Sequence, residues 1–298
     1  MPMTRKPRVM ACAAPLLAVL AAAAGMAAAD NPPGSPPARE LEPGVREIHL
    51  PDGAIYRGAM RGPAYHGKGE YISKAFRYQG DFRDGIKEGE GVYVWQNGDR
   101  YEGTFRADHT DGRGKYRFAN GDTYEGEVKA GEITGRGIYV SRNGDVYEGR
   151  FVGGKPHGIG TYRFASGDRY EGEMDQGRLQ GHGRYFYRNG DRVEASFVNG
   201  NPQGRGVYHF ANGDRYEGEI IGGAPNGQGV YLYQSGIAYE GEVRQGQPEG
   251  RGILRYLDGS LFEGRFENGL ARARGEIVRP DGTRAKGEIV DGNAKLVD

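Results

Sequence analysis

Cysteine is nearly absent from this sequence, since Cys12 is the only one among 298 residues. A single thiol excludes an intramolecular disulfide framework and any cysteine-rich metal site. Net charge is absent too, because 40 basic residues balance 40 acidic ones, so the basic excess of a nucleic-acid-binding protein is missing. Hydrophobic residues form only 37% of the chain, while 54 Gly and 15 Pro exceed ordinary globular usage. A conventional packed core is not expected, yet 20 Tyr and 11 Phe must be buried somewhere.

The first 29 residues differ in composition from the rest. Three basic residues precede an apolar run at 10–24, and small residues end at Ala29. This pattern predicts a secretory signal peptide over 1–29, cleaved after Ala29, and therefore export to the periplasm or the extracellular medium. The alternative is an uncleaved membrane anchor, but the run is shorter than the roughly 20 residues that a span needs. Residues 30–44 contain five prolines and are predicted to form a disordered linker.

A repeat of 23 residues dominates the remainder. A first copy begins at Tyr56, one residue out of phase, and a degenerate last copy begins at Ala285, which gives about eleven repeats over 56–292. Such spacing predicts a solenoid with atypical end repeats. We expect 45–55 to form an amino-terminal half-repeat cap and 293–298 a carboxyl-terminal tail. The regular copies begin at Tyr78, Tyr101, Tyr124, Tyr147, Tyr170, Val193, Tyr216, Tyr239 and Phe262.

Each repeat is predicted to be a β-hairpin, because its apolar residues alternate with period two. With the tyrosine as position 1, positions 1, 3 and 5 share a face, as do 14, 16 and 18. Asn-Gly pairs such as Asn97-Gly98 predict type I′ turns with two positive φ angles, and a longer turn is expected around positions 6–13. Gly at positions 3 and 14 suggests that a tyrosine ring from an adjacent strand covers it. The predicted fold is all-β, an elongated single-layer antiparallel β-hairpin solenoid.

The opposite face carries charges. Glu recurs at position 2 and Arg often at position 23, two places apart on one side of a strand. Carboxylates of neighbouring repeats would be about 10 Å apart, at the far limit for an acid and base pair, so a salt-bridge ladder is predicted. The six histidines show no zinc-site spacing. We therefore predict no catalytic residues, no metal, no cofactor and no enzymatic activity.

Position 18 carries an aromatic stripe on the other face. This stripe is a candidate binding face for a peptide, a sugar ring or an acyl chain, and the alternative is that it forms only the hydrophobic layer of the sheet. Its members are Trp95, Phe118, Phe164, Tyr187, Phe210, Tyr233 and Tyr256.

The pattern Tyr-Glu-Gly-Xaa-Phe followed by Gly-Xaa-Gly-Xaa-Tyr, as in 147–151 and 158–162, resembles the MORN (membrane occupation and recognition nexus) repeat family. The resemblance covers about residues 56–292. It implies a single-layer antiparallel sheet and a scaffold, self-association or membrane-attachment role, without an activity. Departures from the pattern are Asp108 at position 8, Val193 and Ala195 in one copy, and Ile277 and Arg279 in the tenth copy.

The function predicted from the sequence is that of an exported scaffold that binds partner proteins. The alternative is an envelope-associated module that binds glycan or lipid through the aromatic face. Weak, salt-sensitive membrane contact and no nucleic-acid binding are expected, since Arg alternates with Glu. Self-association, with a homodimer as the product, is predicted through carboxyl-terminal apolar residues, and the alternative is a charged cap around Pro280 that blocks edge pairing. The candidate contact residues are Leu261, Phe262, Phe266, Ile277 and Ile289.

Overall fold

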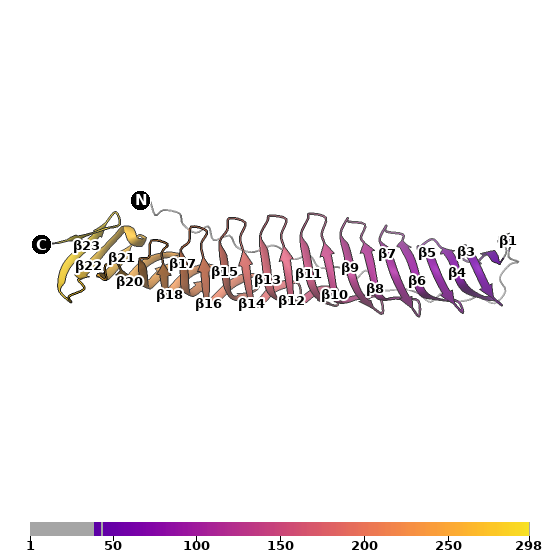
Figure 1. Ribbon diagram of the computed structural model, residues 1–298. Helices are drawn as coiled ribbons and strands as arrows, with labels where there is room; N and C mark the ends of the chain where they lie inside the picture. Colours follow the sequence, from indigo (N-terminus) through magenta and orange to yellow (C-terminus); the bar gives the residue numbers. More distant parts are fainter. Residues whose placement is uncertain (1–38, 43, 298) are drawn as a thin grey trace. The chain divides into compact units, whose positions relative to one another are not determined.

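The computed structural model describes residues 39–42 and 44–297, which form two compact units divided after Ala165. The signal peptide predicted over 1–29 lies outside the described residues. Within each unit the strands follow one another in chain order, each paired antiparallel with its neighbours in a single layer (Figure 1). Apart from one short 3-10 helix, the described residues contain only strands and turns. The predicted all-β hairpin repeat is confirmed.

The first unit contains β1 (Arg39–Glu42), β2 (Val45–His49), β3 (Ile55–Arg61), β4 (Ala64–Ile72), β5 (Phe76–Arg83), β6 (Ile86–Trp95), β7 (Arg100–Arg106), β8 (His109–Arg117), β9 (Thr123–Lys129), β10 (Glu132–Val140), β11 (Val146–Val152) and β12 (Lys155–Arg163). The second contains β13 (Arg169–Asp175), β14 (Arg178–Phe186), β15 (Arg192–Val198), β16 (Asn201–His209), β17 (Arg215–Ile221), β18 (Ala224–Leu232), β19 (Ala238–Arg244), β20 (Gln247–Arg255), β21 (Leu261–Glu267), the 3-10 helix η1 (Gly269–Ala271), β22 (Arg272–Val278), β23 (Arg284–Val290) and β24 (Asn293–Leu296).

Two short strands extend the sheet beyond the predicted array. β1 pairs with β2 and lies inside 30–44, where a linker is predicted. The four residues of β1 contain no proline, so their N–H groups remain available to a ladder. β24 pairs with β23 inside the segment predicted as a tail.

The Asn-Gly turns differ from the prediction. Gly98 has φ 93°, but Asn97 is not among the residues with positive φ, so the turn is not type I′. The Gly98 N–H donates to the Trp95 carbonyl (3.0 Å) and the Trp95 N–H donates to the Asp99 carbonyl (2.9 Å). This is a type I turn closed by a glycine bulge. The cause is local, because the Asn97 side chain accepts a hydrogen bond from the Asp99 N–H (3.0 Å).

Two-residue turns with two positive φ angles lie instead at positions 7 and 8, where a longer turn was predicted. Ala107 and Asp108 have φ 48° and 66°, and Asp84 and Gly85 have φ 51° and 89°. The flanking residues Arg106 and His109 pair directly. The glycine at position 12 is not part of this turn, and at Gly112 (φ 103°) it forms a bulge in the second strand.

Tyrosine rings packed over glycine form the core of each repeat. A Cβ on Gly160 would lie 2.5 Å from a ring carbon of Tyr147, and a Cβ on Gly149 would meet the Tyr147 hydroxyl and lie 2.9 Å from the Gly160 Cα. The expectation of a ring from an adjacent strand is thus confirmed for position 14, whereas position 3 lies under a ring of its own strand. The Tyr147 hydroxyl also donates a hydrogen bond to the Arg150 carbonyl (3.0 Å).

In six copies the aspartate at position 22 joins its repeat to the next. One Asp122 carboxylate oxygen accepts a hydrogen bond from the Arg142 N–H (2.8 Å) and the other accepts from the Tyr139 hydroxyl. Burial alone would raise the pKa of Asp122, but these bonds and one from Asn120 outweigh it and lower that pKa. The same bond to the N–H twenty residues later is made by Asp99, Asp122, Asp145, Asp168, Asp191 and Asp214.

Asp108, the departure from glycine at position 8, forms a buried ion pair. Its carboxylate lies 3.2 Å from the Nζ of Lys87, a side chain only 1% exposed. The same oxygen accepts a hydrogen bond from the Lys87 N–H (3.0 Å), and the ammonium lies 5.3 Å from the centre of the Phe76 ring. Asp108 and Lys87 belong to successive repeats, so their pairing joins those two repeats.

Deleting one repeat in phase is expected to leave a folded first unit. Without 124–146, Asp122 can accept from Ala165 and Tyr162, which donate to Asp145 in the present structure. We expect native circular dichroism and a drop in melting temperature on the order of 5 °C. Deleting only 124–133 removes a strand and its turn, and should unfold the neighbouring hairpins. Equal melting of the two deletion proteins would contradict a nearest-neighbour array.

Candidate functional site

The seven residues of the aromatic stripe lie at the end of the second strand of their hairpins, as Trp95 does in β6, or one residue beyond it. All seven rings are half-buried. In the first unit, the ring centre of Tyr116 lies 6.0 Å from that of Trp95 and 5.7 Å from that of Phe118, and both pairs are stacked. The ring centre of Phe164 lies 4.4 Å from that of Tyr162, and this pair is tilted. Each of these three stripe rings therefore packs on a buried tyrosine and leaves part of its surface open.

The stripe is continuous only in the second unit. There Tyr187, Phe210, Tyr233 and Tyr256 occupy four successive repeats. Tyr231 links two of them, because its ring centre lies 6.2 Å from Phe210 and 5.6 Å from Tyr233. In the first unit, the buried Ser141 takes the equivalent place between Phe118 and Phe164 and interrupts the row.

The hydroxyls of Tyr233 and Tyr256 are neutral. Burial raises the pKa of Tyr233 and of Tyr256, so neither carries charge at neutral pH. Among the described residues, the Tyr256 hydroxyl is buried and has no hydrogen-bond partner. A buried hydroxyl without a hydrogen-bond partner is costly to the fold.

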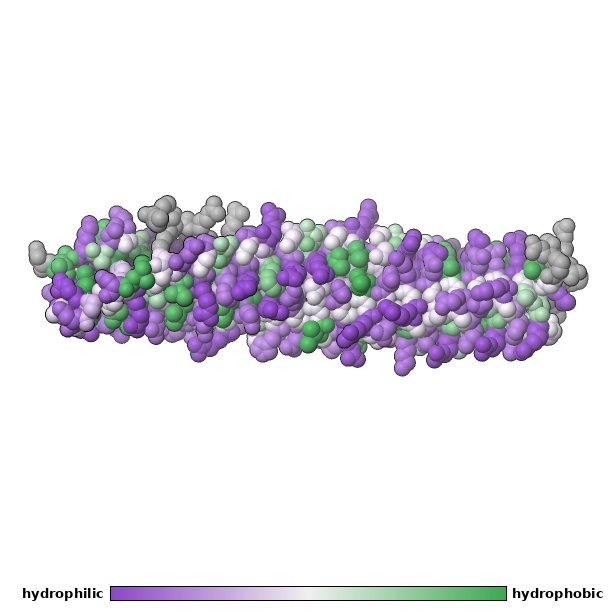
Figure 2. All heavy atoms as spheres, in the orientation of Figure 1, coloured by the Kyte–Doolittle hydropathy of each residue, from purple (hydrophilic) through white to green (hydrophobic). Residues whose placement is uncertain are grey.

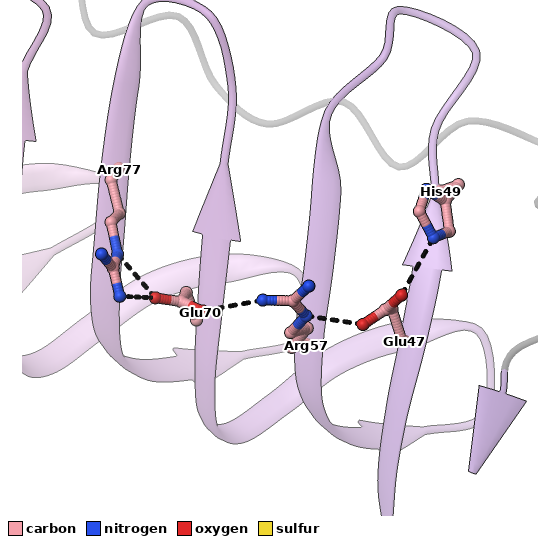
Figure 3. A network of polar contacts seen from close by, with 5 residues as sticks. All are labelled: Glu47, His49, Arg57, Glu70 and Arg77. Atoms are coloured by element: carbon pink, nitrogen blue, oxygen red, sulfur yellow. Dashed lines mark hydrogen bonds and ion pairs between the residues drawn. The ribbon is translucent and has the colours of Figure 1, made fainter. Parts of the chain in front are cut away.

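Charged residues form ladders on the opposite face. In the network of Figure 3, the Arg57 guanidinium lies 2.6 Å from Glu47 and 3.8 Å from Glu70, and Arg77 donates to Glu70 at 2.6 Å. Hydrogen bonds from Arg57 and then His49 lower the pKa of Glu47. The carboxylates of this network are neutralised by cations across strands. The predicted pairing of position 23 with position 2 is found further along the chain, where Arg100 lies 2.6 Å from Glu102. In the face drawn in Figure 2, polar residues predominate and hydrophobic ones form small separate groups.

A shallow hollow of about 490 Å³ interrupts the charged face of the second unit. It forms beside Ser196, which stands at position 4. In other copies a longer acidic side chain at this position lies against the adjacent strand. Glu173 of β13, for example, accepts a hydrogen bond from the His182 N–H of β14 (3.1 Å). The short serine leaves that space empty. The lining residues are Glu171, His182, Gly183, Arg184, Glu194, Ala195, Ser196, Arg205 and Val207.

The predicted self-association residues do not form an exposed patch. Phe262 and Phe266 are 0% exposed and Ile289 is 1% exposed. Only Leu261 and Ile277 are half-buried. An aromatic ring still covers glycine in this copy, because a Cβ on Gly264 would lie 2.8 Å from a ring carbon of Phe262, whereas a Cβ on Gly287 would meet Ile277. Phe262 does what tyrosine does in other copies, so these apolar residues serve the core of the repeat.

Neither a metal centre nor a membrane-spanning helix is found in the part of the chain that the structure describes. Within 39–42 and 44–297, histidines, cysteines and acids nowhere gather in threes that could hold a metal ion. None of the helical segments in these residues has the length and apolarity needed to cross a membrane.

Comparison with protein families identifies the repeat. A family model described as MORN repeat matches nine successive segments. No curated protein matches the chain. The matched segments are 78–100, 101–123, 124–146, 147–169, 170–192, 194–215, 216–237, 239–261 and 262–284.

Solved structures show only a distant likeness. The TCP10c domain of Drosophila melanogaster Sas-4 is 16% identical, with a TM-score of 0.33, over 52% of this chain and 96% of that one. The same organism's SAS-4 TCP domain in complex with a proline-rich motif of Ana2 is 18% identical, with a TM-score of 0.31, over 64% and 100%. The TCP10 domain of Danio rerio CPAP with a STIL peptide is 12% identical, with a TM-score of 0.29, over 87% and 98%. Scores this low support no inference about function.

Proposed function

The chain belongs to the MORN repeat family, and from this premise we propose that it is an exported, non-enzymatic scaffold that binds partner proteins along its aromatic stripe. The observation that carries the proposal is the uninterrupted row of half-buried rings at 187, 210, 233 and 256. Half-exposed rings on a rigid sheet offer a large apolar contact at little cost in side-chain entropy. The composition of residues 1–29 supports export.

The spacing of the stripe suits an extended partner of polyproline type. Each repeat contributes two strands, so successive rings advance by about 9.6 Å. A polyproline II helix rises about 3.1 Å per residue with three residues per turn, or about 9.3 Å per turn. Such a segment, lying across the strands, would set one residue per turn against each ring. Its carbonyls carry no internal hydrogen bonds and stay free to accept hydrogen bonds from water or from exposed groups of the protein.

A fifteen-residue peptide with proline at every third position tests this function. Titrated against residues 30–298, it should bind, and the double variant Phe210→Ala with Tyr233→Ala should weaken binding about tenfold, since each ring contact contributes about 0.5–1.5 kcal/mol. Leu232→Ala is the matched control, because Leu232 precedes Tyr233, points to the opposite face and is 47% exposed. It should change the affinity less than twofold.

Two results would contradict the proposal. One is equal weakening by the Leu232 variant. The other is binding of an oligosaccharide, and not of the peptide, in a way that depends on Phe210 and Tyr233, which would favour the glycan-binding alternative. Export is tested separately by the intact mass of secreted protein, which should begin at Asp30. Retention of residues 1–29 would contradict it.

A further inference from the structure

Three arginines stand in a row on the charged face of the second unit. Arg265 of β21 pairs directly with Arg251 of β20 on one side and with Arg274 of β22 on the other. All three are exposed. Side chains directly opposite one another in an antiparallel pair have Cβ atoms about 4.5–5.5 Å apart, and like charges there are destabilising. The row therefore does not stabilise the sheet by itself.

The neighbouring acidic pair shows how this sheet accommodates like charges. Glu263 and Glu276 also stand directly opposite each other, two residues along the same strands. Arg284 of β23 lies between them, with its guanidinium 2.9 Å from Glu263 and 3.1 Å from Glu276. One group of opposite charge thus bridges two like charges.

The arginine row has no such bridging group. Among the described residues, the guanidinium groups of Arg251, Arg265 and Arg274 make no hydrogen bond and no ion pair. Glu242 flanks the row, but its carboxylate accepts a hydrogen bond from the Arg251 backbone N–H (3.1 Å). Glu288 faces Arg274 across the strands without forming an ion pair.

We propose that Arg251, Arg265 and Arg274 bind a phosphate group, which bridges the opposed arginines as Arg284 bridges the opposed glutamates. A phosphate monoester carries close to two negative charges and three acceptor oxygens at neutral pH. The planar guanidinium fork matches phosphate oxygens in a bidentate way. The chemistry is the same for a soluble phosphorylated molecule and for a lipid headgroup that ends in a phosphate. The site is separate from the aromatic stripe and does not depend on the peptide function.

The test uses residues 30–298 and three probes, namely inorganic phosphate, glycerol 3-phosphate and phosphatidylcholine vesicles that contain phosphatidic acid. We expect the double variant Arg265→Gln with Arg274→Gln to lose at least about tenfold in affinity, as expected when hydrogen bonds to a charged group are removed. Arg136→Gln with Arg150→Gln is the matched control, because these arginines are also opposed and exposed but have no third arginine beside them. The control should lose less than about threefold.

Stability gives a second readout. Without phosphate, the Arg265 and Arg274 double variant should melt at the same temperature as the natural chain or higher, since the repulsion is removed. Phosphate should raise the melting temperature of the natural chain alone. Binding to solutes or to vesicles supports the site and identifies the source of the phosphate. Failure of all three probes, equal loss in the control, or a lower melting temperature of the double variant without phosphate would overturn the proposal.

Discussion

Replacing Gly172 with alanine is expected to lower the free energy of unfolding by about 3 kcal/mol or more, the upper range for overpacking a core. An added Cβ would lie 2.5 Å from the Gly183 Cα, 2.6 Å from the His182 carbonyl oxygen and 2.5 Å from the Tyr170 hydroxyl. Two of these neighbours are backbone atoms of the adjacent strand, which cannot swing aside. The strands must separate, and the ring of Tyr170 then loses the surface on which it lies.

Gly222→Ala is the matched control in the same unit. A Cβ there meets nothing within 4 Å, and its φ is 60°. Position 7 holds alanine in other copies, where Ala107 and Ala130 both have φ 48°. The control should therefore cost no more than about 1 kcal/mol. Urea unfolding followed by circular dichroism measures both variants, and a cost at Gly172 equal to that at Gly222 would refute the account of the tyrosine and glycine core.

One natural repeat already combines the two changes. Val193 replaces the tyrosine and Ala195 the glycine, and both are buried. The pairing of β15 with β16 is irregular between Glu194 and Ser196, so Ala195 has no directly opposed partner on β16. Introducing Tyr170→Val together with Gly172→Ala should accordingly cost less than the sum of the two single changes, by about 1 kcal/mol.

The hairpin repeat could be predicted from the sequence because its signals are local and recur at a fixed period. The alternation of side chains along the strands around Tyr147 and Tyr162 determines which of them share a face. The same alternation predicts which face carries the aromatic stripe. The turn types could not be separated in the same way, since glycine or asparagine stands at both ends of the hairpin. The Asn97 side chain accepts a hydrogen bond from the Asp99 N–H, and this bond outweighs the preference of an Asn-Gly pair for a type I′ turn.

Contacts that depend on the register between strands could not be predicted from the sequence. The bond from Asp122 to the Arg142 N–H joins residues twenty apart, and the Arg265 and Arg274 pair becomes visible only when β21 and β22 are aligned. The self-association prediction places Phe262 and Phe266 at a contact surface. In the fold they are core, since phenylalanine can cover a glycine as tyrosine does.

Alkaline unfolding is the second large effect expected. Burial raises the pKa of Tyr147 to about 12, and burial together with the nearby Glu219 raises that of Tyr216 to about 12, from an ordinary value of 10.0. The unfolded chain ionises near pH 10, whereas the folded chain keeps these phenols neutral. Stability is therefore fully present below pH 10 and is lost as the pH rises toward 12. The tyrosines at position 1 that are 0% exposed are Tyr56, Tyr78, Tyr101, Tyr124, Tyr147, Tyr170, Tyr216 and Tyr239.

The steepness of the transition measures how many tyrosines belong to the core. Each phenol that ionises only on unfolding lowers the free energy of unfolding by about 1.4 kcal/mol per pH unit above pH 10. Phenolate absorbance and circular dichroism should change together in one steep step. Tyr147→Phe should flatten this step by one proton and, through loss of the bond to the Arg150 carbonyl, cost about 1 kcal/mol at neutral pH. Full phenolate absorbance near pH 10 with native circular dichroism would show that the rings are open to water, because only solvated phenols ionise at their ordinary pKa.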